Sequence, residues 1–112
     1  MGVTKSDLFS KNQNELAGVA KVLAHPARIA ILQILLRSNS CNNGDLVDEL
    51  GLAQATISQH LRELKDSGLI QGTIEGTRVN YCINPHRWEK IKQEFNLFFE
   101  EFTRPPFEEG CC

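Results

Sequence analysis

Residues 45–70 read DLVDELGLAQATISQHLRELKDSGLI, which is the pattern of two short helices joined by a tight turn. Gly51 suits such a turn because glycine readily adopts left-handed backbone conformations, and Leu52 would anchor the turn to the core. The second helix is expected over residues 53–66, where a Ser-Gly pair ends it. Apolar residues recur at helical spacing on both sides of the turn, at Leu46, Val47, Leu50, Ile57, Leu61 and Leu64. The stretch therefore predicts a helix-turn-helix unit.

The outer face of the second predicted helix is rich in amides and hydroxyls and carries no acidic residue from Leu52 to Arg62. Base edges in the DNA major groove present both donors and acceptors, so side chains that contact them need the same versatility. Carboxylates would instead be repelled by the phosphates. We therefore predict that this helix enters the major groove. The predicted contacts are Gln54, Thr56, Ser58 and Gln59 to base edges, Arg62 and Lys65 to phosphates, and His60 to either.

A hairpin is predicted directly after the two helices. LIQGTIEG (69–76) and TRVNYCIN (77–84) alternate apolar and polar residues, and Gly76 lies between them. We predict that Thr77 and Arg78, near the tip, contact a phosphate or the minor groove, although Glu75 beside them is unfavourable. One polar helix alone would more simply be a solvated surface helix. The turn and the hairpin in register with it favour a winged helix-turn-helix that binds DNA.

Helices are also predicted on both sides of this unit. A first helix from about Asn12 carries an apolar stripe, and the segment PARIAILQILLRS (26–38) is apolar almost all round, which is typical of a central buried helix. Asn42 or Asn43 would cap the first helix of the helix-turn-helix. A last helix is expected over residues 86–102. The predicted fold is mainly α with a small β-hairpin (α+β), in a single domain over 1–112 with its core at about 12–102 and a flexible tail at 103–112.

The last helix has more aromatic surface than a core of this size needs. One interpretation is that the stripe only covers the domain's own core. We expect part of it to do so and the rest to contact a second copy, together with the first helix. The predicted homodimer contacts are Leu16, Val19, Leu23, Trp88, Phe95, Phe98, Phe99 and Phe102. Two-fold symmetry would place two recognition helices about 34–36 Å apart and would require a palindromic operator.

Composition sets wider limits. The chain has 112 residues, of which 41% are hydrophobic and 23% charged, and no apolar run approaches the roughly 18 residues of a membrane span. The N-terminus lacks the apolar segment of a signal peptide, so we expect a cytoplasmic protein with four reduced cysteines. The net charge of −2 is unusual for a DNA-binding protein. Residues 94–109 contribute −4 (five acidic residues and one arginine), which leaves +2 on the remainder.

The segments LAHPARIAILQIL, LAQATISQHLRELKDSGLI and GTRVNYCIN resemble the winged-helix repressors of the ArsR/SmtB family over about residues 15–100. The resemblance implies a dimeric cytosolic transcriptional repressor that leaves operator DNA when an effector binds. The chain departs from the family at Ala53, where members often have a serine as helix N-cap. Losing such a cap costs about 1 kcal/mol.

Sensor sites implied by the resemblance do not match this sequence. The positions of the arsenic-type Cys-x-Cys pair hold Asn42 and Gly44, and the positions of the zinc-type site hold Asn84, His86, Leu97 and Glu100. Cys111 and Cys112 remain as candidate thiol ligands for a soft metalloid, completed by Cys41 or Cys82. The alternative is that these terminal thiols bind nothing. We therefore predict no metal and no cofactor, and leave the effector open.

Two other classes of function fit the sequence less well than DNA binding. The sequence has no nucleophile elbow and no phosphate-binding glycine loop, so an enzyme is not expected. A winged helix that binds only protein is the remaining alternative. The acidic balance of the chain favours it slightly, and the amide-rich helix argues against it.

Overall fold

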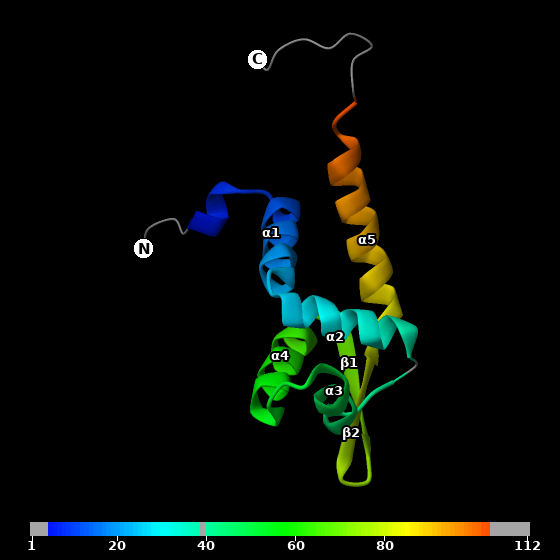
Figure 1. The fold of residues 1–112 in the computed structure, drawn as a ribbon. Coiled ribbons are helices and arrows are strands. Elements are labelled where there is room, and N and C mark those ends of the chain that lie inside the picture. Colours follow the sequence, from blue (N-terminus) through cyan, green and yellow to red (C-terminus); the bar gives the residue numbers. More distant parts are fainter. Residues whose placement is uncertain (1–4, 39, 104–112) are drawn as a thin grey trace.

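The computed structural model describes residues 5–38 and 40–103, which form helices and one hairpin (Figure 1). A short 3-10 helix, η1, is followed by α1 and α2, then by α3 and α4, the hairpin and α5. The bounds are η1 Lys5–Leu8, α1 Lys11–Leu23, α2 Pro26–Arg37, α3 Asn43–Leu50, α4 Gln54–Asp66, β1 Ile70–Glu75, β2 Arg78–Ile83 and α5 Pro85–Glu100. The arrangement is the winged helix that the sequence predicts.

Helix α2 lies in the middle of the molecule. In Figure 1 the helices α1 and α5 extend from one side of it, and α3, α4 and the hairpin lie on the other. Its residues Ile31, Leu32 and Leu35 are buried, as the apolar pattern predicts. Each fully buried aliphatic side chain contributes about 1.5–3 kcal/mol relative to an exposed one. The rest of the core comes from the elements around α2, chiefly through Leu46, Ile57, Leu61, Leu64, Leu69, Ile70 and Ile91.

The helix ends have identifiable causes. Ser10 caps α1 and exchanges hydrogen bonds with Gln13, so this helix begins earlier than predicted. Asn42 makes the equivalent capping box for α3 with Asp45. Gly51 ends α3 with a φ of 72°, the left-handed conformation expected at this turn. The N-cap residue of α4 is Ala53, which has no side chain to cap the helix.

The hairpin is antiparallel, with Ile70 paired to Ile83 at its base and Glu75 paired to Arg78 at its tip. One further bridge joins it to the segment before α3, which the sequence predicts only as a loop. There Cys41 N donates to Tyr81 O over 3.0 Å, and Tyr81 N donates to Cys41 O over 2.8 Å. The thiol of Cys41 is buried as a result, and Cys82 is half-buried on β2.

No single helix within the described residues is long and apolar enough to cross a membrane. Helices α1 and α2 satisfy the criteria of length and composition only when taken together, and they are bent by 92° from each other. The predicted tail lies almost wholly outside the described residues. The candidate thiols of Cys111 and Cys112 also lie outside the described residues.

Candidate nucleic-acid interface

Helix α4 has one apolar side and one polar side. Ile57, Leu61 and Leu64 are buried against the core. The opposite side is exposed and holds six of the predicted DNA contacts, which are Gln54, Thr56, Ser58, Gln59, Arg62 and Lys65. The helix therefore presents amides, hydroxyls and two cations to the outside while its buried side fixes its orientation.

The start of α4 is held by Asn43 of α3, which the sequence suggested only as a possible helix cap. The Nδ2 atom of Asn43 donates to Ser58 Oγ over 2.7 Å and lies 3.5 Å from the carbonyl oxygen of Gln54. These contacts join the two helices at the outer face, where Ala53 supplies no cap. An asparagine near a helix start is usually interpreted as a cap, so only the fold reveals this contact.

His60 is less exposed than the other predicted DNA contacts of α4. Its side chain is half-buried, and its Nδ1 atom accepts a hydrogen bond from Arg28 Nε over 3.0 Å. Burial lowers the pKa of His60 below its usual value, and the nearby charges of Arg28 and His25 lower the pKa further. The His25 and His60 rings are 5.8 Å apart. The imidazole therefore serves as a neutral acceptor inside the protein.

The wing lies beside the helix pair. Thr77 and Arg78 are exposed at the hairpin tip, and Glu75 is the strand partner of Arg78. A hollow of about 500 Å³ separates this part of the wing from α3 and the start of α4. Polar side chains from all three elements line it, including Asn43, Ser58 and Arg78. Asp45 and Asp48 also line the hollow, and their carboxylates would repel a phosphate there.

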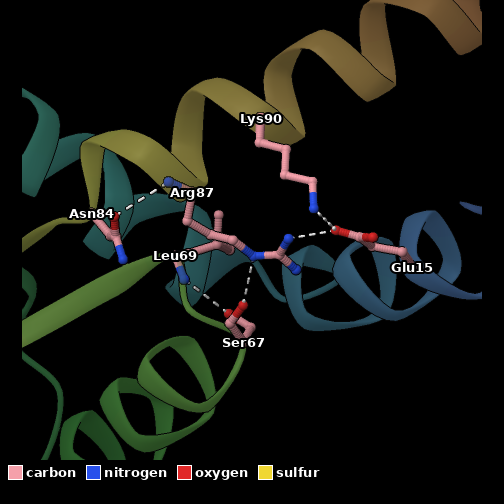
Figure 2. A network of polar contacts seen from close by, with 6 residues as sticks. All are labelled: Glu15, Ser67, Leu69, Asn84, Arg87 and Lys90. Atoms are coloured by element: carbon pink, nitrogen blue, oxygen red, sulfur yellow. Dashed lines mark hydrogen bonds and ion pairs between the residues drawn. The ribbon is translucent and has the colours of Figure 1, made fainter.

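A polar network joins the far end of α4 to α1 and α5 (Figure 2). Arg87, on α5, contacts the Glu15 carboxylate of α1 and donates from Nε to the carbonyl oxygen of Ser67, 3.3 Å away. Lys90 Nζ lies 4.0 Å from the same carboxylate. The hydrogen bond from Arg87 lowers the pKa of Glu15, against a smaller opposing effect of burial. The residue after α4 is thus tied to the two outer helices.

The aromatic stripe of α5 divides into two parts. Trp88 and Phe95 are half-buried and pack on the core, whereas Phe98 and Phe99 are exposed. Phe102 is exposed as well, but α5 ends at Glu100, so this residue lies just beyond the helix predicted to contain it. Of the three predicted dimer contacts on α1, Leu16 and Leu23 are half-buried, and Val19 is already buried in the single chain. Val19 therefore has almost no surface left for a partner. The described residues contain no group of three or more His, Cys, Asp and Glu side chains placed to hold a metal ion.

Comparison with known proteins identifies the family. The family model for bacterial regulatory proteins of the arsR family matches residues 25–71, from the cap of α2 to the start of β1. The HTH-type transcriptional regulator YgaV of Escherichia coli is 35% identical over 81 residues, which cover 72% of this chain and 82% of YgaV. The chain belongs to the ArsR family. The model for this family describes bacterial regulatory proteins.

Other relatives of this ArsR-family chain agree. The HTH-type transcriptional regulator CmtR of Mycobacterium bovis is 38% identical over 71 residues, which cover 63% of this chain and 59% of CmtR. The match thus spans less than two thirds of the length of CmtR. Among solved structures, HlyU from Vibrio cholerae superposes with a TM-score of 0.66 at 28% identity, covering 80% of this chain and 98% of HlyU. The winged helix of this ArsR-family chain is that of known regulators.

Proposed function

We propose that this chain is a DNA-binding transcriptional repressor that acts in the cytoplasm as a homodimer on a palindromic operator. Helix α4 enters the major groove, and Gln54, Thr56, Ser58 and Gln59 contact base edges. Arg62 and Lys65 contact phosphates, as do Thr77 and Arg78 of the wing. The relatives support repression, because one of them is the HTH-type transcriptional repressor SmtB of Mycobacterium tuberculosis, 41% identical over 71 residues.

The exposed side of α4 carries this proposal. Its four uncharged polar residues offer hydrogen-bond donors and acceptors to bases, and all four are exposed. The buried side of the same helix is anchored by Ile57, Leu61 and Leu64. A rigid support of this kind lets short side chains discriminate between bases, because their positions are set by the core.

The homodimer rests on the exposed aromatic residues of α5. Phe98 is 51% exposed and Phe99 68% on α5, and Phe102, just after this helix, is 73% exposed. A hollow of about 470 Å³ between α1 and α5 adds apolar surface around Leu16 and Phe95. Contiguous apolar surface of this kind marks a contact with another protein, and a second copy would place two α4 helices on one face of DNA.

Fluorescence anisotropy tests the proposal. The protein is titrated into labelled DNA from directly upstream of its own gene and, separately, into a scrambled duplex. We expect preferential binding that saturates at two protomers per site and weakens steeply with salt, because phosphate contacts release counterions. Weak signals that are equal on both duplexes and independent of salt would instead favour a module that binds only protein. If the protein binds the upstream duplex preferentially, arsenite, zinc and oxidants are screened for release of the bound protein.

A further inference from the structure

The contact between Asn43 and Ser58 has a defined direction. The amide nitrogen of Asn43 lies 2.7 Å from Ser58 Oγ and 3.5 Å from the carbonyl oxygen of Gln54. A carbonyl oxygen has no proton to donate, so the group that faces it must be the amide nitrogen rather than the amide oxygen. Ser58 Oγ therefore accepts the hydrogen bond, and Asn43 occupies one of its two lone pairs.

This direction leaves the hydroxyl proton of Ser58 uncommitted. The Oγ atom makes no other hydrogen bond to the described residues, and the side chain is exposed on the outer face of α4. We propose that Asn43 is a positioning residue that keeps the Ser58 hydroxyl as a hydrogen-bond donor to an acceptor atom of bound DNA. This inference rests on the proposed function and adds a specificity determinant to it.

The surroundings of the pair favour this role over a purely structural one. Both residues line the polar hollow between α3, α4 and the wing, where Arg78 also lies. The Oδ1 atom of Asn43 is buried and has no partner within the described residues. A side chain that served only to join two helices would be expected to satisfy both ends of its amide. Asn43 instead satisfies the end that orients Ser58.

Exchanging Asn43 for aspartate reverses the hydrogen bond. A carboxylate has no proton to donate, so it would accept a hydrogen bond from the Ser58 hydroxyl, whose oxygen would then present only lone pairs to DNA. The Asn43→Asp chain should still fold, because position 43 begins α3 and a negative charge is favourable in the first turn of a helix. A thermal melt checks the fold, and anisotropy measures binding to an operator selected from random duplexes.

A double-mutant cycle separates the hydroxyl effect from the added charge. The four proteins are the unchanged chain, Asn43→Asp, Ser58→Ala and the double variant. The new charge weakens binding in both backgrounds, whereas loss of the donor weakens it only where Ser58 is present. We expect Asn43→Asp to weaken binding about threefold to tenfold more with Ser58 than with alanine at that position. An equal loss of DNA affinity on Asn43→Asp in the two backgrounds would overturn the inference.

Modified duplexes identify the acceptor. A methylphosphonate removes the charge and acceptor strength of one phosphate, and a 7-deazapurine removes one base-edge acceptor. We expect one such substitution to abolish the coupling between Asn43 and Ser58. Coupling that survives substitution of every phosphate and of every base-edge acceptor, the keto oxygens included, would lie within the protein and overturn the inference. If the unchanged chain enriches no duplex, the proposed function fails as well. If it enriches a duplex but Asn43→Asp weakens binding equally in both backgrounds, only the role of Asn43 is removed.

Discussion

Arg28 Nε donates a hydrogen bond to His60 Nδ1 over 3.0 Å, which joins the start of the central helix to the middle of the recognition helix α4. Arg28 is only 9% exposed, and its Nη1 atom donates to the carbonyl oxygen of Val22 over 3.2 Å. The contact requires a neutral imidazole, because a protonated ring would turn an N–H donor toward a guanidinium. This hydrogen bond between α2 and α4 therefore depends on the protonation state of a single histidine.

Stability should fall as the solution is acidified through the range where His60 takes up a proton. The folded protein has a lowered pKa for this group, so the unfolded chain binds the proton first, at its usual value of about 6.5. The stabilisation is complete above that pH and is lost as the pH falls through the lowered pKa. Urea unfolding at pH 7.5 and 5.5 measures the difference. His60→Gln keeps an acceptor for Arg28 and should flatten this dependence; an unchanged slope would contradict the assignment.

Breaking the network at Arg87 should destabilise the protein. The Arg87 and Glu15 side chains are both partly shielded from solvent, so their hydrogen bond should contribute about 1 kcal/mol. Glu15→Gln should lower the free energy of unfolding by about that amount and Arg87→Met by more, and the two losses should not add. Arg87→Met also removes the contact to Ser67 after α4 and should weaken DNA binding more than Glu15→Gln does. Additive losses in urea unfolding would rule out direct coupling.

Acid should also remove the contribution of Glu15. Its carboxylate has a lowered pKa in the folded protein, chiefly through the hydrogen bond from Arg87. The stabilisation is therefore present above the usual glutamate value of about 4.3 and is lost as the pH falls through the lowered pKa. Comparing the unfolding free energies of the unchanged chain and Glu15→Gln between pH 6 and 3 isolates the contribution of the ionised Glu15 carboxylate. Their stabilities should converge at the acid end.

Arg62 should contribute affinity without selectivity. Removing a phosphate contact weakens binding to all duplexes alike and reduces the slope of log affinity against log salt by about 1. Arg62→Gln should show both effects in anisotropy titrations. Arg37→Gln provides a control with the same change of charge, since Arg37 is exposed at the end of α2 beside Glu49. A selective loss on the operator alone would instead assign Arg62 to a base edge.

The aromatic residues of α5 should control assembly. Phe99 contacts both Phe95 and Phe98, with ring centroids 6.3 Å and 5.3 Å apart. Phe99→Ser should shift the protein toward monomer in sedimentation experiments and weaken operator binding in parallel. Ile74→Ser is the matched control, because this residue is 77% exposed on the wing rather than on α5. A dimer that resists Phe99→Ser would contradict the proposed interface.

Local patterns in the sequence predicted the elements well, because helix periodicity, Gly51 and the alternation in the hairpin are properties of neighbouring residues. The apolar side of α4 and its exposed polar side followed from the same periodicity. The polar contacts between distant segments did not follow. Asn43 meets Ser58, and His60 turns to Arg28, only after α3 and α2 pack on α4. A half-buried histidine on the flank of a helix has no distinctive spacing, so the sequence did not reveal the contact of His60 with Arg28.

The hairpin is held at its base and free at its tip. The paired hydrogen bonds between Cys41 and Tyr81 add a third segment beside β2, whereas the residues around Gly76 are exposed. A two-stranded ribbon without such support is marginally stable in water. Backbone amides should therefore exchange with deuterium slowly near Tyr81 and quickly near the tip. A duplex that engaged Arg78 would have to order that end, so part of the wing's contact energy would be offset by lost conformational entropy.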